Sequence, residues 1–138
     1  MGVLPKLSGS DLVCTDFSDR TAWEQASSEA QREYADGFRA YLEPICDPAF
    51  DGLSWEAVKA AVPGDDDEGA VLFIADAAAL ASPEHPILVV DLLDDRPPFR
   101  CIPSQLWSVE NNLSIANMDW EEFADAVDDD GIFRGFPE

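Results

Sequence analysis

Basic side chains are scarce in this sequence. Eight Lys and Arg residues stand against 29 Asp and Glu residues, which gives a formal net charge of −21 at pH 7. Nucleic acids and anionic membrane surfaces repel a protein surface of this sign, so we expect neither as a direct partner. An anionic substrate would also find few cations to hold it. The charge therefore favours a basic partner, or else it serves only solubility.

The residue types that most catalytic and metal sites require are also few. The only histidine, His85, lies between prolines in "SPEHP", where we expect a surface loop, so a catalytic triad lacks a well-placed base. The three cysteines, Cys14, Cys46 and Cys101, have no zinc-binding spacing, and we interpret them as free thiols in a reducing cytosol. No Gly-rich phosphate loop or G-x-G-x-x-G motif occurs. We therefore expect no cofactor, assign no catalytic residue and favour a protein that is not an enzyme.

Long hydrophobic runs are absent as well. No apolar stretch approaches the ~20 residues of a membrane-spanning helix, and the first residues show no secretory signal pattern. Hydrophobic residues still make up 46% of the chain, with four Trp and eight Phe, which is enough for a core. We expect one cytoplasmic domain over residues 1–138, with residues 1–10 as a loose N-terminal segment. The sequence does not specify an oligomeric state.

Apolar runs and turn residues predict an α/β sandwich around a mixed sheet of about five strands, with α+β as an alternative. The two most apolar runs have the continuous hydrophobicity of central, buried strands. A single helical turn and a Pro-bounded loop separate them, and the second should form a hairpin over residues 87–102. The expected strands are 11–16, 38–43, 70–76, 87–93 and 99–102.

Two helices precede the first central strand in this scheme. Ser18 offers an N-cap to a helix that runs to about Tyr34. Ser54 caps a shorter helix, in which Leu53 and Val58 occupy the two positions of a hydrophobic staple.

The stretch "SQLWSVENNLSIANMDWEEFADAV", residues 104–127, predicts two further, C-terminal helices. Asp119 can cap the second helix. We interpret "NNLSIAN" as the connector, in which Asn111 and Asn112 satisfy the backbone rather than bind a ligand. Glu110 should accept hydrogen bonds if it is buried. The expected core residues of these helices are Leu106, Val109, Leu113, Trp120, Phe123 and Val127.

Aspartates at the ends of apolar strands suggest one candidate metal site. Asp16 and Asp76 each follow such a strand, and their carboxylates would meet if the strands are parallel neighbours. Oxygen ligands of this kind suit Mg²⁺ and a hydrolase or phosphatase reaction. Asp91 also lies in a strand, but two residues before its end. The structural alternative is that Asp simply favours positions where a strand gives way to a turn.

The uneven distribution of charge suggests a different function. Residues 43–76 and 108–138 each carry nine acids and one base, which leaves room for a negative face that attracts a basic protein. An immunity protein that masks a basic toxin would be one form of this function. Trp107 or Trp120 could provide a desolvated anchor. The candidate partner-binding residues are Trp107, Glu110, Asp128, Asp129 and Asp130.

Three stretches are similar to a known family. "TDFSDRTAWE", "PEHPILVVDL" and above all "PSQLWSVENNLSIANMDWEEFADAVDDDGIFRGF" resemble a family of small, acidic, single-domain bacterial proteins of unknown function. The resemblance covers Leu12 to Phe136, which is nearly the whole chain. It implies a stand-alone cytoplasmic domain, and it brings no activity and no catalytic residues with it.

Overall fold

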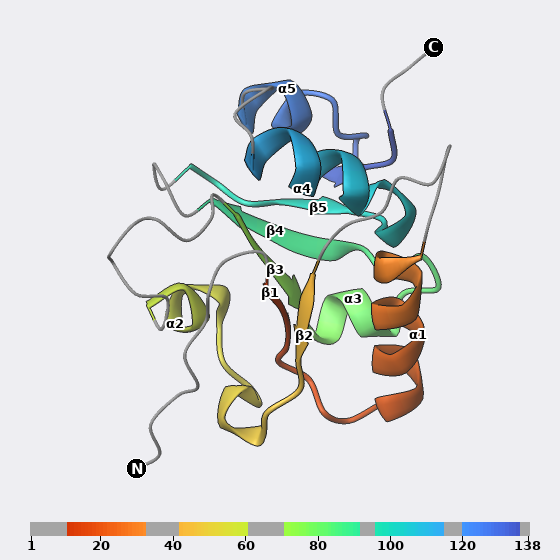
Figure 1. Cartoon of the computed structure of the whole chain (residues 1–138), viewed down its shortest axis with the longest axis vertical. Coiled ribbons are helices and arrows are strands. Elements are labelled where there is room, and N and C mark those ends of the chain that lie inside the picture. The colour runs from red at the N-terminus through yellow and green to blue at the C-terminus, as the bar shows by residue number, and fades with distance from the viewer. Residues whose placement is uncertain (1–10, 33–41, 61–70, 92–95, 115–119, 136–138) are drawn as a thin grey trace.

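The structure is a computed structural model that describes residues 11–32, 42–60, 71–91, 96–114 and 120–135 (Figure 1). Its centre is a six-stranded mixed sheet in the order β2-β1-β3-β4-β5-β6. β1 runs parallel to β2 and β3, β4 is antiparallel to β3 and β5, and β6 is parallel to β5. The strands are β1 Asp11–Cys14, β2 Glu43–Ile45, β3 Val71–Ala75, β4 Ile87–Asp91, β5 Phe99–Cys101 and β6 Ile132–Phe133.

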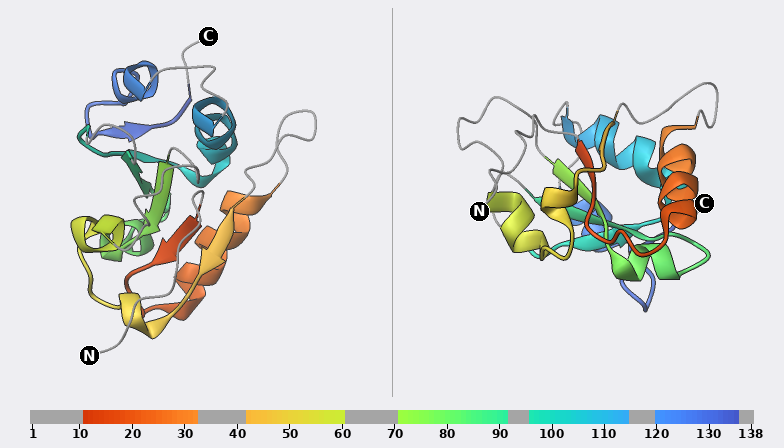
Figure 2. Two further views of the ribbon diagram at one scale, coloured as in Figure 1. Left: turned by 60° about the vertical axis from the view of Figure 1, so that its left-hand side comes forward. Right: turned by 90° about the horizontal axis from the view of Figure 1, so that it is seen from below.

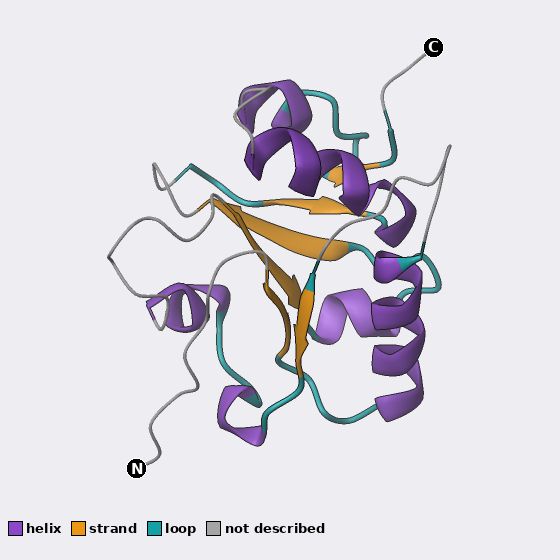
Figure 3. Cartoon of the chain, viewed as in Figure 1, coloured by secondary structure: helices purple, strands orange, loops and turns teal. Residues whose placement is uncertain are grey.

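Helices cover both faces of the sheet (Figure 3). On one face, α1, α3, α4 and α5 share a core with alternate residues of the central strands, such as Phe73 and Val89. On the other face, α2 and a short 3-10 helix pack against the residues between them, such as Leu72 and Val90. Figure 2 shows α1 and α2 on opposite sides of the strands. Burial on both faces explains why the central strands are continuously apolar. The helices are α1 Arg20–Gln31, α2 Trp55–Ala60, α3 Ala77–Ala81, α4 Leu106–Ser114 and α5 Trp120–Ala124.

The predicted fold class, the central strands and the hairpin are confirmed. β3 and β4 are fully buried neighbours, and β4 pairs with β5 in antiparallel register, with Val89 opposite Phe99. The helix after Ser54 is also confirmed, because the Ser54 hydroxyl accepts a hydrogen bond from the Ala57 N–H at 3.3 Å. Leu53 packs against the same cluster as the buried Val58, as a staple requires.

The cap of α1 is Asp19 and not Ser18. The Asp19 carboxylate accepts a hydrogen bond from the Ala22 N–H at 3.0 Å. The Ser18 N–H is instead bound by the Asp16 carboxylate at 3.0 Å, in a local turn that leads the chain out of β1. The helix ends at Gln31, and the predicted end near residue 34 lies outside the described residues.

β2 lies further along the chain than predicted. It spans Glu43–Ile45, while most of the predicted strand at 38–43 lies outside the described residues. Pro44 lies within it, which a strand tolerates at the edge of a sheet because one side needs no ladder hydrogen bonds. The following segment contains a 3-10 helix at Pro48–Phe50, which Asp47 caps through the Ala49 N–H at 2.9 Å.

Both C-terminal helices are confirmed, but the connector between them begins later than predicted. α4 continues through Asn111 and Asn112 to Ser114. Packing of the amphipathic face outweighs the weak helix propensity of Asn. The roles of these two side chains, and the Asp119 cap, lie outside the described features.

The core prediction for these helices is confirmed for Leu106, Val109, Trp120 and Phe123, which are all buried. Val127 is partly buried and packs against the same cluster. The Leu113 side chain is outside the described features. β6, a strand of two residues, was not predicted and makes the sheet six-stranded rather than five-stranded.

Candidate protein-binding surface

Six exposed carboxylates gather on α5 and on the turn that follows it. We call this group the C-terminal acidic surface. α5 presents Glu121 and Glu122 to solvent because Trp120 and Phe123 occupy its inner face. The members are Glu121, Glu122, Asp125, Asp128, Asp129 and Asp130.

A tight turn holds the last three of these aspartates. The Asp128 N–H donates to the Ile132 carbonyl at 2.9 Å, and the Gly131 N–H donates to the Asp128 carbonyl at 2.8 Å. Gly131 has a φ of 81°, a conformation that glycine adopts without steric cost. The turn therefore places Asp128 and Asp130 at fixed positions beside β6.

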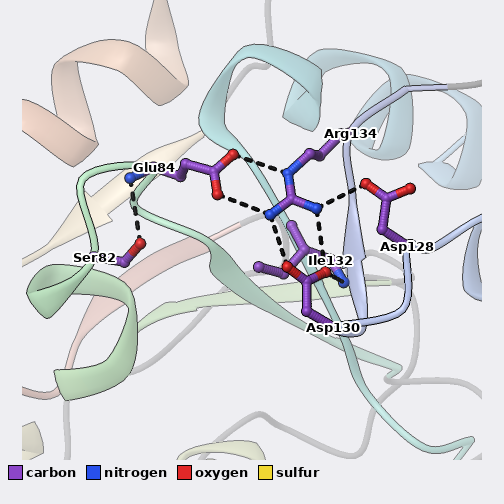
Figure 4. Close-up of polar contacts among 6 residues, drawn as sticks. All are labelled: Ser82, Glu84, Asp128, Asp130, Ile132 and Arg134. Atoms are coloured by element: carbon purple, nitrogen blue, oxygen red, sulfur yellow. Dashed lines mark hydrogen bonds and ion pairs between the residues drawn. The ribbon is translucent and has the colours of Figure 1, made fainter.

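Arg134 joins these two aspartates to a distant loop (Figure 4). Its Nε and Nη2 atoms donate to the two carboxylate oxygens of Glu84, each at 2.8 Å. Its Nη1 atom donates to Asp128 at 2.7 Å, and Nη2 donates to Asp130 at 2.8 Å. One guanidinium thus serves three carboxylates. The α3–β4 loop and the C-terminal turn are held together by this cluster.

The same contacts fix the protonation states of the cluster. Hydrogen bonds from Arg134 lower the pKa of both Glu84 and Asp130. Hydrogen bonds to Glu84, and then to the two aspartates, raise the pKa of Arg134. Glu84, Asp130 and Arg134 therefore stay charged at neutral pH.

An open groove of about 650 Å³ lies beside this cluster. Ala126 and Val127 provide apolar surface, and Arg134 is the cation in its lining. Among the described residues, Glu122, Asp125 and Asp129 make no ion pair. A groove of this kind suits a lysine or arginine side chain, whose stem packs on apolar surface while its head meets carboxylates. The lining residues are Glu122, Asp125, Ala126, Val127, Asp128, Arg134 and Gly135.

Of the five predicted partner-binding residues, the structure brings the three aspartates together. Trp107 and Glu110 lie on α4 instead. Trp107 is partly buried against the core, and Glu110 is buried, at 6% exposure. Trp120, the other proposed anchor, is 3% exposed and packs edge-on against Phe99 at 4.9 Å, so it is a core residue.

Sequence reasoning missed five charged members of this site, namely Glu84, Glu121, Glu122, Asp125 and Arg134. Glu122 and Asp125 could have been found, because they lie off the apolar stripe of a predicted helix. Glu84 could not, because its contact with Arg134 spans 50 residues.

The candidate metal residues lie where the parallel pairing predicts. β1 and β3 are parallel neighbours, with Cys14 opposite Ala75, so Asp16 and Asp76 follow adjacent strand ends. Asp76, however, is bound by Arg100, with Nη1–Oδ1 at 2.9 Å and Nη2–Oδ2 at 2.8 Å. It also caps α3 through the Ala79 N–H at 3.0 Å.

The electrostatics of Asp76 follow from these partners. Partial burial alone would raise the pKa of Asp76, but the hydrogen bonds from Arg100 and Ala79 outweigh it, and the pKa is lowered. Asp91, the weaker third candidate, is buried in β4 and accepts a hydrogen bond from the Arg96 N–H at 3.2 Å. No group of three or more His, Cys, Asp and Glu side chains suited to a metal ion occurs among the described residues.

His85 is buried, which corrects the prediction of a surface position. It is 6% exposed, and its Nδ1 lies 3.0 Å from Glu29 Oε1 on α1. Its φ of 48° is an uncommon backbone conformation for a residue other than glycine. The contact with Glu29 holds the α3–β4 loop against α1, and this accounts for the burial.

Within the described ranges, no helix is both long and apolar enough to cross a membrane. A search of curated proteins finds no match to the chain. The model of a family described as a domain of unknown function, DUF6924, matches residues 9–136, and the chain therefore belongs to this family.

Proposed function

We propose that this protein is a non-enzymatic, acidic interaction protein that binds a basic protein partner through the C-terminal acidic surface. An immunity protein that masks a basic toxin in the bacterial cytoplasm is one concrete form of this function. The observation that carries the proposal is the groove beside Arg134, where carboxylates that form no ion pair within the described part of the chain border apolar surface.

Electrostatics would make such a partner bind quickly and selectively. A surface of one sign raises the association rate of a partner of the opposite sign, and salt weakens the effect because the screening length is about 10 Å at 0.1 M. The net charge of −21 provides long-range attraction. The groove would provide the local fit, in which a lysine or arginine of the partner contacts Glu122 and Asp125.

Arg134 has a structural part in this proposal. It is only 29% exposed, and three carboxylates hold it. Its charge is therefore largely compensated before a partner arrives, while it keeps Asp128 and Asp130 in place for binding. The predicted anchor Trp107 stays a candidate contact, because its side chain is only partly buried and the rest is accessible to a partner.

The test is capture of partners from the native lysate at low and moderate salt, with matched charge variants. Glu122→Gln/Asp125→Asn removes two charges from the groove. Asp51→Asn/Glu56→Gln is the control, which removes two exposed charges from the region of α2. The variants are matched because Glu56, like Glu122, lies in the first turn of its helix. We expect a basic protein that salt releases, and that only the groove variant loses.

Two outcomes contradict the proposal. If both variants lose the partner equally, net charge and not the groove determines binding. If no salt-sensitive basic protein is captured, the acidic surface serves solubility alone. Asp16 and Asp76 give the alternative of a Mg²⁺-dependent hydrolase little support, because Asp76 is already bound to Arg100.

A further inference from the structure

The thiols of Cys14 and Cys46 lie side by side where β1 and β2 end. The two strands pair in parallel, with Val13 opposite Ile45, so the next residue of each strand also faces its neighbour. The two side chains also line the same cavity, so they lie on the same face of the sheet. Neighbouring strands lie ~4.8 Å apart, and a disulfide spans Cα atoms about 4.4–6.8 Å apart. The backbone positions are therefore compatible with a disulfide.

The two thiols differ in their access to solvent. Cys46 is exposed, whereas Cys14 is 1% exposed. Burial, with a smaller contribution from the adjacent Cys46, raises the pKa of Cys14 to about 11. The Cys14 S–H donates to the Asp16 carbonyl at 3.2 Å. A reagent from solvent therefore meets Cys46 first, and Cys14 lies behind it as a protonated thiol.

Both cysteines line one cavity of about 390 Å³. Phe17 and Trp23 give this cavity aromatic walls, and Asp16 and Arg20 give it one carboxylate and one guanidinium. A small molecule with an apolar part and charged groups of both signs could therefore sit beside Cys46. Cys101 is different, since it is fully buried and donates to the Ile102 carbonyl at 3.3 Å.

We propose that Cys14 and Cys46 form a thiol–disulfide exchange site for small disulfide compounds. In the first step, the Cys46 thiolate attacks one sulfur of the compound. The sulfur–sulfur bond of the compound breaks, a mixed disulfide forms at Cys46, and one small thiolate leaves.

In the second step, Cys14 gives up its proton and its sulfur attacks the Cys46 sulfur. The Cys14–Cys46 bond forms, and the second small thiolate leaves and takes up a proton. Two protein thiols are oxidised and one small disulfide is reduced to two thiols, so atoms and electrons balance. A small dithiol reverses the reaction.

Oxidised glutathione serves as the probe, and reduced protein is the starting material. Samples are quenched with acid, alkylated and mapped by peptide mass spectrometry. We expect wild type and Cys101→Ala to end with a Cys14–Cys46 disulfide. Cys14→Ala should stop at a mixed disulfide on Cys46, and Cys46→Ser should stay unmodified. Closure of the mixed disulfide should be faster by about tenfold per pH unit below the pKa of Cys14.

Two results overturn the proposal. One is a wild-type protein that keeps the mixed disulfide at Cys46 even at a pH near 11, where a large part of Cys14 is deprotonated. The other is a disulfide that involves Cys101 or links two chains. The wild-type peptide map gives the pairing by itself, so the test holds even where a substitution at the buried Cys14 prevents folding.

Discussion

Arg100 of β5 and Asp76 at the end of β3 form a two-point ion pair across β4. The two nitrogen–oxygen distances are 2.9 and 2.8 Å. The same guanidinium donates to the Pro86 carbonyl at 3.1 Å, and Asp76 also caps α3. This single arginine therefore connects β5 to the end of β3, to the α3–β4 loop and, through Asp76, to α3.

Removing the guanidinium should destabilise the fold. Arg100→Ala leaves the partly buried Asp76 with only its helix cap, and we expect a loss of about 1–3 kcal/mol in the free energy of unfolding. Arg100→Lys should recover only part of it, because one ammonium cannot make two parallel bonds. Urea denaturation measures both. Arg20→Ala is the control, since its pair with Glu24 is exposed and should contribute less than about 1 kcal/mol. Equal losses at the two arginines would contradict this assignment.

The contribution of Asp76 should depend on pH in one direction. Its pKa in the folded protein lies below the ordinary value of 3.8, so its carboxylate stabilises the fold at a pH above that value. The contribution is lost as the pH falls through the lowered folded-state pKa. The difference in unfolding free energy between wild type and Asp76→Asn should therefore be constant near neutral pH and shrink below about pH 4. Denaturant titrations at several pH values measure this difference. A difference that grows on acidification would contradict the predicted pH dependence.

The features that could be predicted are those that a short stretch specifies. β3 and β4 are continuous apolar runs because both faces of the sheet are covered, and Ser54 is a cap because its side chain reaches an N–H three residues on. Features that depend on distant pairing were missed. β6 has two residues, and its ladder partner β5 lies about 30 positions earlier.

The α3–β4 loop shows that contacts between distant parts of the chain also limited the prediction of the candidate sites. Three consecutive residues are each held by a distant element: Glu84 by Arg134, His85 by Glu29, and the Pro86 carbonyl by Arg100. "SPEHP" has the composition of a surface loop, and the sequence does not show that these distant contacts hold its histidine in a buried position. The Cys14–Cys46 pair was missed for a related reason, because it depends on the register of β2, which lies further along the chain than predicted.

Arg134 should hold β6 in place. The Arg100 N–H donates to the Gly131 carbonyl at 3.2 Å, and the Ile102 N–H donates to the Phe133 carbonyl at 3.2 Å. In Arg134→Gln the turn loses its tie to Glu84, so these two amides should exchange hydrogen faster than in wild type. Amides between β3 and β4 should not change, and they are the internal control. Unchanged exchange at both β6 contacts would show that Arg134 does not order this edge.

Trp120 and Phe123 should respond differently to truncation, although both are buried on α5. The Trp120 indole N–H has no hydrogen-bond partner among the described residues, and an unsatisfied buried donor costs about 1–3 kcal/mol. Trp120→Phe removes that donor, which stabilises the fold, and also removes some packing against Phe99, which destabilises it. The two effects should partly cancel, so the free energy of unfolding should change by less than about 1.5 kcal/mol.

Phe123 offers no such compensation. Its ring packs against Phe99 and Phe133, and its side chain is completely buried. Phe123→Ala should therefore cost about 3–5 kcal/mol through lost burial and a cavity. Phe123→Leu is the matched variant, which keeps most of the volume and should cost less. Thermal and urea unfolding compare the variants. A Trp120→Phe loss as large as that of Phe123→Ala would mean that the indole N–H finds a partner in solution, because only then would its removal add to the cost of lost packing.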